Sequence, residues 1–174
     1  MPASDLYDLA QDLLLASEGA LQSTPRGVPS RSFVGWCDPA TDCCDQLTVH
    51  ISQVSRSENV GPSSGVDRGM LCSSLNVVVM WVTLMRCVPV GELEGDVFVP
   101  PPGNAMSVAA YSLLVDVWTL WNRIQSLLRD GTLFGDDDSC RPIELLPAEC
   151  IAESGICAGW RIGLIVQVNA DPSL

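Results

Sequence analysis

The stretch that decides the fold of this chain is AMSVAAYSLLVDVWTLWNRIQSLL, residues 105–128. Its spacing predicts a long helix whose apolar side chains occur almost all the way round, and Asp116 is the one charged residue before Asn122. A surface helix of a small domain carries one apolar stripe about 100° wide, with charged side chains opposite. We therefore expect this helix to be covered on both sides.

The two sides of this helix are expected to have different partners. One side packs on a sheet, and its residues are Val108, Tyr111, Val115 and Trp118. The other side needs a second cover, and its residues are Ala109, Leu113, Val117, Leu120 and Ile124. Because a single domain of this length has few spare elements, we expect a neighbouring subunit to supply that cover. The sequence thus predicts an assembling protein.

The remaining patterns complete the predicted architecture. Residues 4–22 have the apolar spacing of an amphipathic helix, with Ser4 placed to cap it. Strands are expected at residues 33–36, 46–54, 73–88, 143–151 and 158–168. We predict an α+β fold of one domain, residues 1–174, in which an N-terminal helix and one long helix pack on a mixed, mostly antiparallel sheet.

Two of these strands are expected to differ in burial. In residues 46–54 apolar and polar residues alternate, which predicts a half-exposed strand. Its exposed side would hold Thr48, His50 and Ser52. Residues 73–88 are apolar on both sides over most of their length, which is typical of a central strand. Between the elements, residues 55–70 and 89–103 are rich in Gly, Ser or Pro and are expected to form long loops.

The charge balance argues against several functions. The chain has 174 residues, with 9 Lys and Arg against 21 Asp and Glu, and a formal net charge of −12. A protein that grips nucleic-acid phosphates needs a basic surface, whereas an acidic one suits DNA that slides past without binding. The N-terminus is acidic, unlike a signal peptide, and no apolar run is long enough to span a membrane. We expect a soluble protein made in a cytoplasm.

Eight cysteines leave three interpretations open. They are buried free thiols, members of one or two disulfides, or ligands of a metal. The closest cluster is Cys37, Cys43 and Cys44, with His50 six residues further on. This cluster is a candidate zinc site, although structural zinc sites prefer spacers of two to four residues within each ligand pair.

Signatures of catalysis are missing from the sequence. It contains no G-x-S-x-G, H-E-x-x-H, Walker A or G-x-G-x-x-G motif. His50, the single histidine, has no nucleophile motif beside it, and we expect it to be solvated or to lie at an interface. The acidic run Asp136 to Asp138 lacks the interleaved ligands of a calcium loop. We expect neither an enzyme nor a bound cofactor.

Three segments carry a resemblance to a known family. They are CDQLTVHI at 44–51, LNVVVMWVTLMRCVPV at 75–90 and GICAGWRIGLIVQV at 155–168, with the long helix between the last two. In this order they resemble the tail terminator proteins of long-tailed phages that infect actinobacteria, over most of residues 4–168.

The resemblance implies a structural virion protein with a tail-terminator-like fold. Such subunits form a homo-hexameric ring at the head–tail junction, end the tail tube and join it to the head-side stopper or connector protein. DNA passes through the lumen without specific binding, and no membrane is involved. The protein would be assembled in the bacterial host cytoplasm and would reside in the neck of the virion. Its partners would be other copies of itself, the tail tube protein and the stopper.

The ring implied by this resemblance gives two sets of candidate site residues. A closed ring uses a heterologous interface, in which each subunit buries one patch under its neighbour. The candidate interface residues are Leu113, Val117, Leu120, Trp121, Ile124, Met80 and Val82. The candidate residues for loops that line the lumen or dock a partner are Glu58, Asp67, Arg68, Glu92, Glu94 and Asp96.

Two alternatives remain open at this point. The first is a head-side stopper or adaptor ring of the same neck, which the sequence does not separate from a tail terminator. The second belongs to a different class and is a small cytoplasmic metal-binding domain built around Cys37, Cys43, Cys44 and His50.

Overall fold

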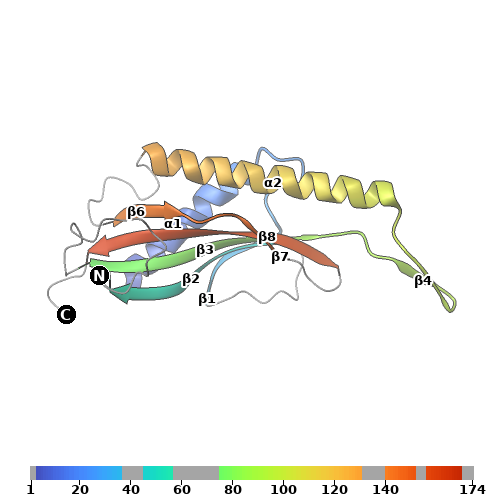
Figure 1. Ribbon diagram of the computed structural model, residues 1–174, viewed down its shortest axis with the longest axis horizontal. Coiled ribbons are helices and arrows are strands. Elements are labelled where there is room, and N and C mark those ends of the chain that lie inside the picture. The colour runs from blue at the N-terminus through green and yellow to red at the C-terminus, as the bar shows by residue number, and fades with distance from the viewer. Residues whose placement is uncertain (1–2, 37–44, 57–74, 131–139, 152–155, 170–174) are drawn as a thin grey trace.

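The described part of the chain forms two long helices, a main sheet and a separate two-stranded hairpin (Figure 1). The computed structural model describes residues 3–36, 45–56, 75–130, 140–151 and 156–169. Its elements are α1 (Ala3–Leu21), β1 (Arg31–Trp36), β2 (Gln46–Arg56), β3 (Leu75–Cys87), β4 (Glu92–Glu94), β5 (Val97–Val99), α2 (Gly103–Asp130), β6 (Cys140–Leu145), β7 (Glu149–Ile151) and β8 (Cys157–Asn169).

The main sheet has the strand order β1-β2-β3-β8-β6, and β7 also pairs with β8. β1 runs parallel to β2, whereas every other pair in this sheet is antiparallel. The predicted α+β class with a mixed, mostly antiparallel sheet is therefore confirmed. β6 contains Pro142 at a register shift, which suits an outer strand because proline has no amide hydrogen to donate.

β3 is the central strand, as its apolar sequence predicts. It pairs with β8 over its whole length and with β2 from Asn76 to Met85. The core lies between the sheet and both helices, with Leu13 of α1, Leu84 of β3 and Leu120 of α2 among its fully buried members. Since the two helices share this one core, the sheet and its helical cover form a single hydrophobic unit.

Three local predictions are corrected by the structure. Thr48 and His50, two of the three residues expected on the exposed side of β2, are both fully inaccessible, whereas Ser52 is exposed as expected. His50 is therefore not a solvated residue within the described chain. The expected loop at 89–103 contains the hairpin formed by β4 and β5, and the expected strand at 143–151 is divided into β6 and β7.

Candidate assembly surfaces

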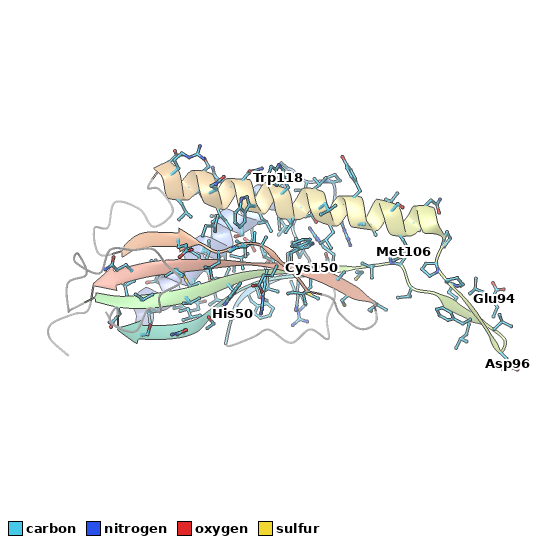
Figure 2. The ribbon with its side chains drawn as sticks, in the orientation of Figure 1. His50, Glu94, Asp96, Met106, Trp118 and Cys150 are labelled. Atoms are coloured by element: carbon cyan, nitrogen blue, oxygen red, sulfur yellow. The ribbon has the colours of Figure 1, made fainter. Side chains whose placement is uncertain are left out.

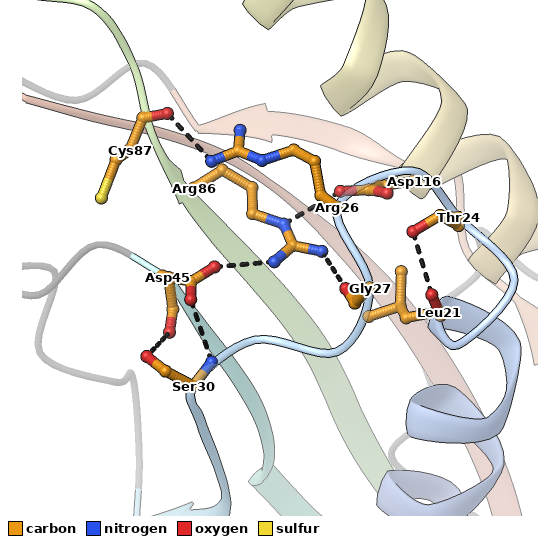
Figure 3. Close-up of polar contacts among 9 residues, drawn as sticks. All are labelled: Leu21, Thr24, Arg26, Gly27, Ser30, Asp45, Arg86, Cys87 and Asp116. Atoms are coloured by element: carbon orange, nitrogen blue, oxygen red, sulfur yellow. Dashed lines mark hydrogen bonds and ion pairs between the residues drawn. The ribbon is translucent and has the colours of Figure 1, made fainter.

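A buried ion-pair cluster joins α2 to the sheet (Figure 3). The Arg86 side chain of β3 donates from Nε to Asp116 Oδ2 of α2 at 2.9 Å and from Nη1 to Asp45 Oδ1 at 2.7 Å. Its Nη2 donates to the carbonyl oxygen of Gly27 at 2.6 Å. The Arg86 side chain is 1% exposed and that of Asp116 is 0% exposed. One arginine thus ties β3, α2 and the segments before β1 and β2 together.

Asp45 completes this cluster at the start of β2. Its φ of 61° is left-handed, and its carboxylate accepts a hydrogen bond from the Ser30 amide at 3.0 Å. Burial raises the pKa of Asp45, but the Ser30 amide and the Arg86 guanidinium lower it by more, so the pKa lies below its ordinary value. The carboxylate is therefore held in its charged form beside the arginine.

The ion pair also fixes the rotation of α2 about its own axis. Residues two positions apart in an α-helix lie about 200° apart around the axis, because each residue adds about 100°. With Asp116 held against Arg86, Leu114 and Trp118 must point away from the sheet. Both are exposed, Trp118 by 66%. A single buried charge thus decides which face of an apolar helix reaches solvent.

The exposed face of α2 forms an apolar surface that we call the outer strip. It consists of Val108, Tyr111, Leu114 and Trp118, each more than half exposed. Farther along the same face the helix becomes polar, at Asn122, Gln125 and Arg129. The outer strip therefore occupies the N-terminal half of α2, and the first turns of that half extend past the end of the sheet (Figure 1).

The two faces of α2 are exchanged relative to the sequence-based prediction. The side expected to need a neighbouring subunit packs in the chain's own core, and most of the side expected to pack on the sheet is exposed. The candidate interface residues that are buried in this core are Leu113, Val117, Leu120, Ile124, Met80 and Val82, and Trp121 is partly buried against it. α1 and the sheet provide the cover that the sequence analysis expects from a neighbouring subunit.

The β4–β5 hairpin is the second exposed apolar feature. It projects away from the sheet, with Glu94 and Asp96 near its tip (Figure 2). Every residue of both strands is exposed. Leu93 is paired with Phe98, and because opposite residues of an antiparallel pair share a face, these two side chains form one apolar face. They are 74% and 63% exposed, respectively.

Gly91 lies directly against the Phe98 ring of this apolar face. A Cβ added at Gly91 would lie 2.3 Å from Phe98 Cζ and 2.6 Å from the Val99 carbonyl oxygen. The glycine therefore lets the phenyl ring lie directly against the backbone. The turn uses Gly95, whose φ of +66° is in the left-handed region that glycine adopts without strain.

The predicted docking residues divide into two groups. Glu92 and Glu94 lie on β4 and Asp96 in the turn of the hairpin, and all three are exposed. Glu58, Asp67 and Arg68 lie outside the described residues.

The face of the sheet opposite the helices carries a polar and aromatic group. Trp81 Nε1 donates to Ser52 Oγ at 3.1 Å, and the Arg161 guanidinium lies 4.7 Å from the centre of the Trp81 ring. Arg161 also pairs with Glu149 at 2.8 Å. Gly163 leaves room for the indole, since a Cβ there would lie 2.9 Å from it. These contacts join β2, β3, β7 and β8 on that face.

The alternative of a metal site depends on how the cysteines and the other metal-ligand residues are placed. Within the described residues, no three His, Cys, Asp or Glu side chains gather as a metal ion requires. Cys37, Cys43 and Cys44 fall outside those residues. Among the described cysteines, Cys157 is disulfide-bonded, whereas Cys87 and Cys150 are free thiols.

Comparison with known proteins gives no family for this chain. No model of a protein family matches it, and no curated protein does either. Neither helix in the described part of the chain combines the length and the hydropathy that a membrane crossing requires. The outer strip and the hairpin are therefore interpreted from their own chemistry.

Proposed function

We propose that this chain is a ring-forming subunit of the neck of a long-tailed phage, and specifically the tail terminator. The observation that carries the proposal is the pair of exposed apolar surfaces, the outer strip and the hairpin. Apolar patches of this kind on a soluble protein mark contacts with other proteins. A subunit that must bind its neighbours and a tail tube requires such surfaces on more than one side.

Two other features support the same function. The three segments named above, at 44–51, 75–90 and 155–168, resemble the tail terminator family, whose subunits are α+β proteins. The net charge of −12 per chain also suits a ring around DNA, because repeated copies would repel phosphates along the channel. DNA would then pass without binding.

The test has two steps. The first measures the mass of the purified protein by sedimentation over a wide concentration range and examines the same fractions by negative-stain electron microscopy, with and without tail tube protein. Rings are expected in at least one of these mixtures. A monomer under every condition contradicts the proposal.

The second step determines the position in the neck. The protein is mixed separately with isolated tails and with DNA-filled heads that lack tails, and the bound protein is located by immunolabelling. A tail terminator binds the head-proximal end of the tails. Binding to the heads alone would instead assign the chain to a head-side stopper or adaptor ring.

A further inference from the structure

We propose that the β4–β5 hairpin of one copy packs on the outer strip of α2 of the next copy, so that subunits join head to tail. This inference rests on the proposed self-association of the chain and specifies the surfaces that form it. It does not depend on the position of the ring in the neck.

The hairpin and the outer strip of one chain point in different directions. The hairpin precedes α2 and projects beyond its N-terminal end (Figure 1). The outer strip lies on the side of α2 away from Asp116 and the sheet. Both remain exposed in the folded chain. Each is therefore free to meet the complementary surface of another copy.

Both surfaces present leucine and aromatic side chains. Leu93 and Phe98 present one leucine and one aromatic ring on a single face of the hairpin. On the outer strip, Tyr111, Leu114 and Trp118 are spaced by three and four residues, so they lie side by side on one face of the helix. Aromatic side chains bury large areas and dominate the energetics of protein interfaces.

The hairpin and the exposed side of α2 differ in charge, in a chain that is acidic overall. Residues 89–103 contain three carboxylates, Glu92, Glu94 and Asp96, and no basic residue. Along α2, by contrast, Asp116 is buried, so the exposed charged side chains are two arginines, Arg123 and Arg129, and one carboxylate, Asp130, at the C-terminal end of the helix. An acidic hairpin would be repelled by most of this molecule, whereas the outer strip carries no charged side chain and the exposed charges of α2 are on balance basic.

The occupant of the outer strip is therefore a second copy of this chain. A contact between two different patches is heterologous, and it closes into a ring when the rotation between subunits divides a full turn. In such a contact each subunit contributes its hairpin to one neighbour and its outer strip to the other. The two surfaces can therefore be removed separately by mutation.

The experiment uses two variants of the full chain, each missing one side of the contact. The hairpin variant is Leu93→Glu/Phe98→Glu, and the acceptor variant is Tyr111→Glu/Trp118→Glu. Leu15→Glu, which changes an exposed leucine of α1, is the matched control. Circular dichroism and thermal melting establish that each variant is folded, and Leu93→Glu alone replaces the hairpin variant if the double change unfolds the chain. Masses are measured by sedimentation, singly and in equal mixture.

Each outcome of the mixing experiment is decisive. We expect the unmodified chain and the Leu15→Glu control to form the same oligomer, each variant alone to be monomeric, and the mixture to form a dimer that does not grow. If the variants retain the oligomer, or the mixture remains monomeric while the unmodified chain assembles, the two surfaces do not pair and the outer strip binds another occupant, such as the tail tube. If the unmodified chain never assembles, the proposed ring itself is wrong.

Discussion

Arg86 Nε lies 2.9 Å from Asp116 Oδ2, and both side chains of this ion pair between β3 and α2 are buried. Removing two charges from water is costly unless they are paired and hydrogen-bonded, and here the arginine is satisfied by Asp116, Asp45 and the Gly27 carbonyl. The same contact sets the rotation of α2 and hence exposes Leu114 and Trp118. The stability of the fold and the proposed assembly surface therefore both depend on one buried pair.

The first prediction concerns that pair. Asp116→Ala should lower the free energy of unfolding by about 3–5 kcal/mol, because it removes the fully buried carboxylate that pairs with the buried Arg86 guanidinium. Glu149→Ala is the matched control, since it breaks the partly exposed pair with Arg161 and should cost less than about 1 kcal/mol. Urea denaturation measures both. Equal losses would show that the buried pair has no special role.

The second prediction concerns pH and Asp45. Its pKa is lowered in the folded chain, so the stability it contributes is fully present above the unfolded pKa, about 3.9. That stability is lost as the pH falls through the lower, folded pKa. The difference in unfolding free energy between the unmodified chain and Asp45→Asn should therefore be constant near pH 7 and shrink below about pH 4. A difference that stays constant down to pH 2 would contradict the assignment.

The third prediction compares two glycines. At Gly159 an added Cβ would lie 2.4 Å from the Leu84 carbonyl oxygen, so Gly159→Ala should destabilise the sheet by about 1–3 kcal/mol. At Gly19, within α1, nothing lies within 4 Å of an added Cβ, so Gly19→Ala should stabilise the chain by about 0.5–1 kcal/mol. The midpoint of thermal unfolding should therefore fall for Gly159→Ala and rise for Gly19→Ala. A shift in the same direction would show that the backbone approach at Gly159 is not close.

The fourth prediction separates assembly from stability. Gly91→Ala should displace Phe98 and weaken the oligomer, while the melting temperature changes little because the hairpin is exposed throughout. Gly103→Ala, beyond the other end of the hairpin and with open space around its Cβ position, is the control and should assemble normally. Sedimentation at several concentrations compares the two. Normal assembly of Gly91→Ala would remove the hairpin from the contact.

Much of the architecture follows from sequence periodicity. Apolar residues on both sides of β3, alternation in β8 and the long apolar run of α2 each fix an element type, because burial demands those patterns. The rotation of α2 about its axis does not follow from periodicity, because the sequence of a helix that is apolar all round does not indicate which face packs on the sheet. The informative signal is a single acid in that apolar run and a single arginine in an apolar strand. Opposite charges on two buried elements are expected to pair, because an unpaired buried charge is costly.

The hairpin and the burial of β2 illustrate two other limits. The pair Gly95–Asp96 between short alternating segments is a hairpin signal, but its surrounding prolines and glycines favour a loop when composition alone is considered. For His50 and Thr48, alternation predicts an exposed side, whereas burial on that side depends on what the rest of the chain places over it. Glu92, Glu94 and Asp96 stay predicted docking residues, now placed on a defined hairpin.

The proposed role in ending the tail tube is tested by the length of tail tubes polymerised with and without this protein. Tail tube protein is assembled in its presence, in its absence, and with the Tyr111→Glu/Trp118→Glu variant, and tube lengths are measured by electron microscopy. A ring that terminates the tube predicts short tubes with extra density at one end, and unrestricted tubes in the other two samples. Unrestricted, uncapped tubes in all three samples would contradict the proposed function.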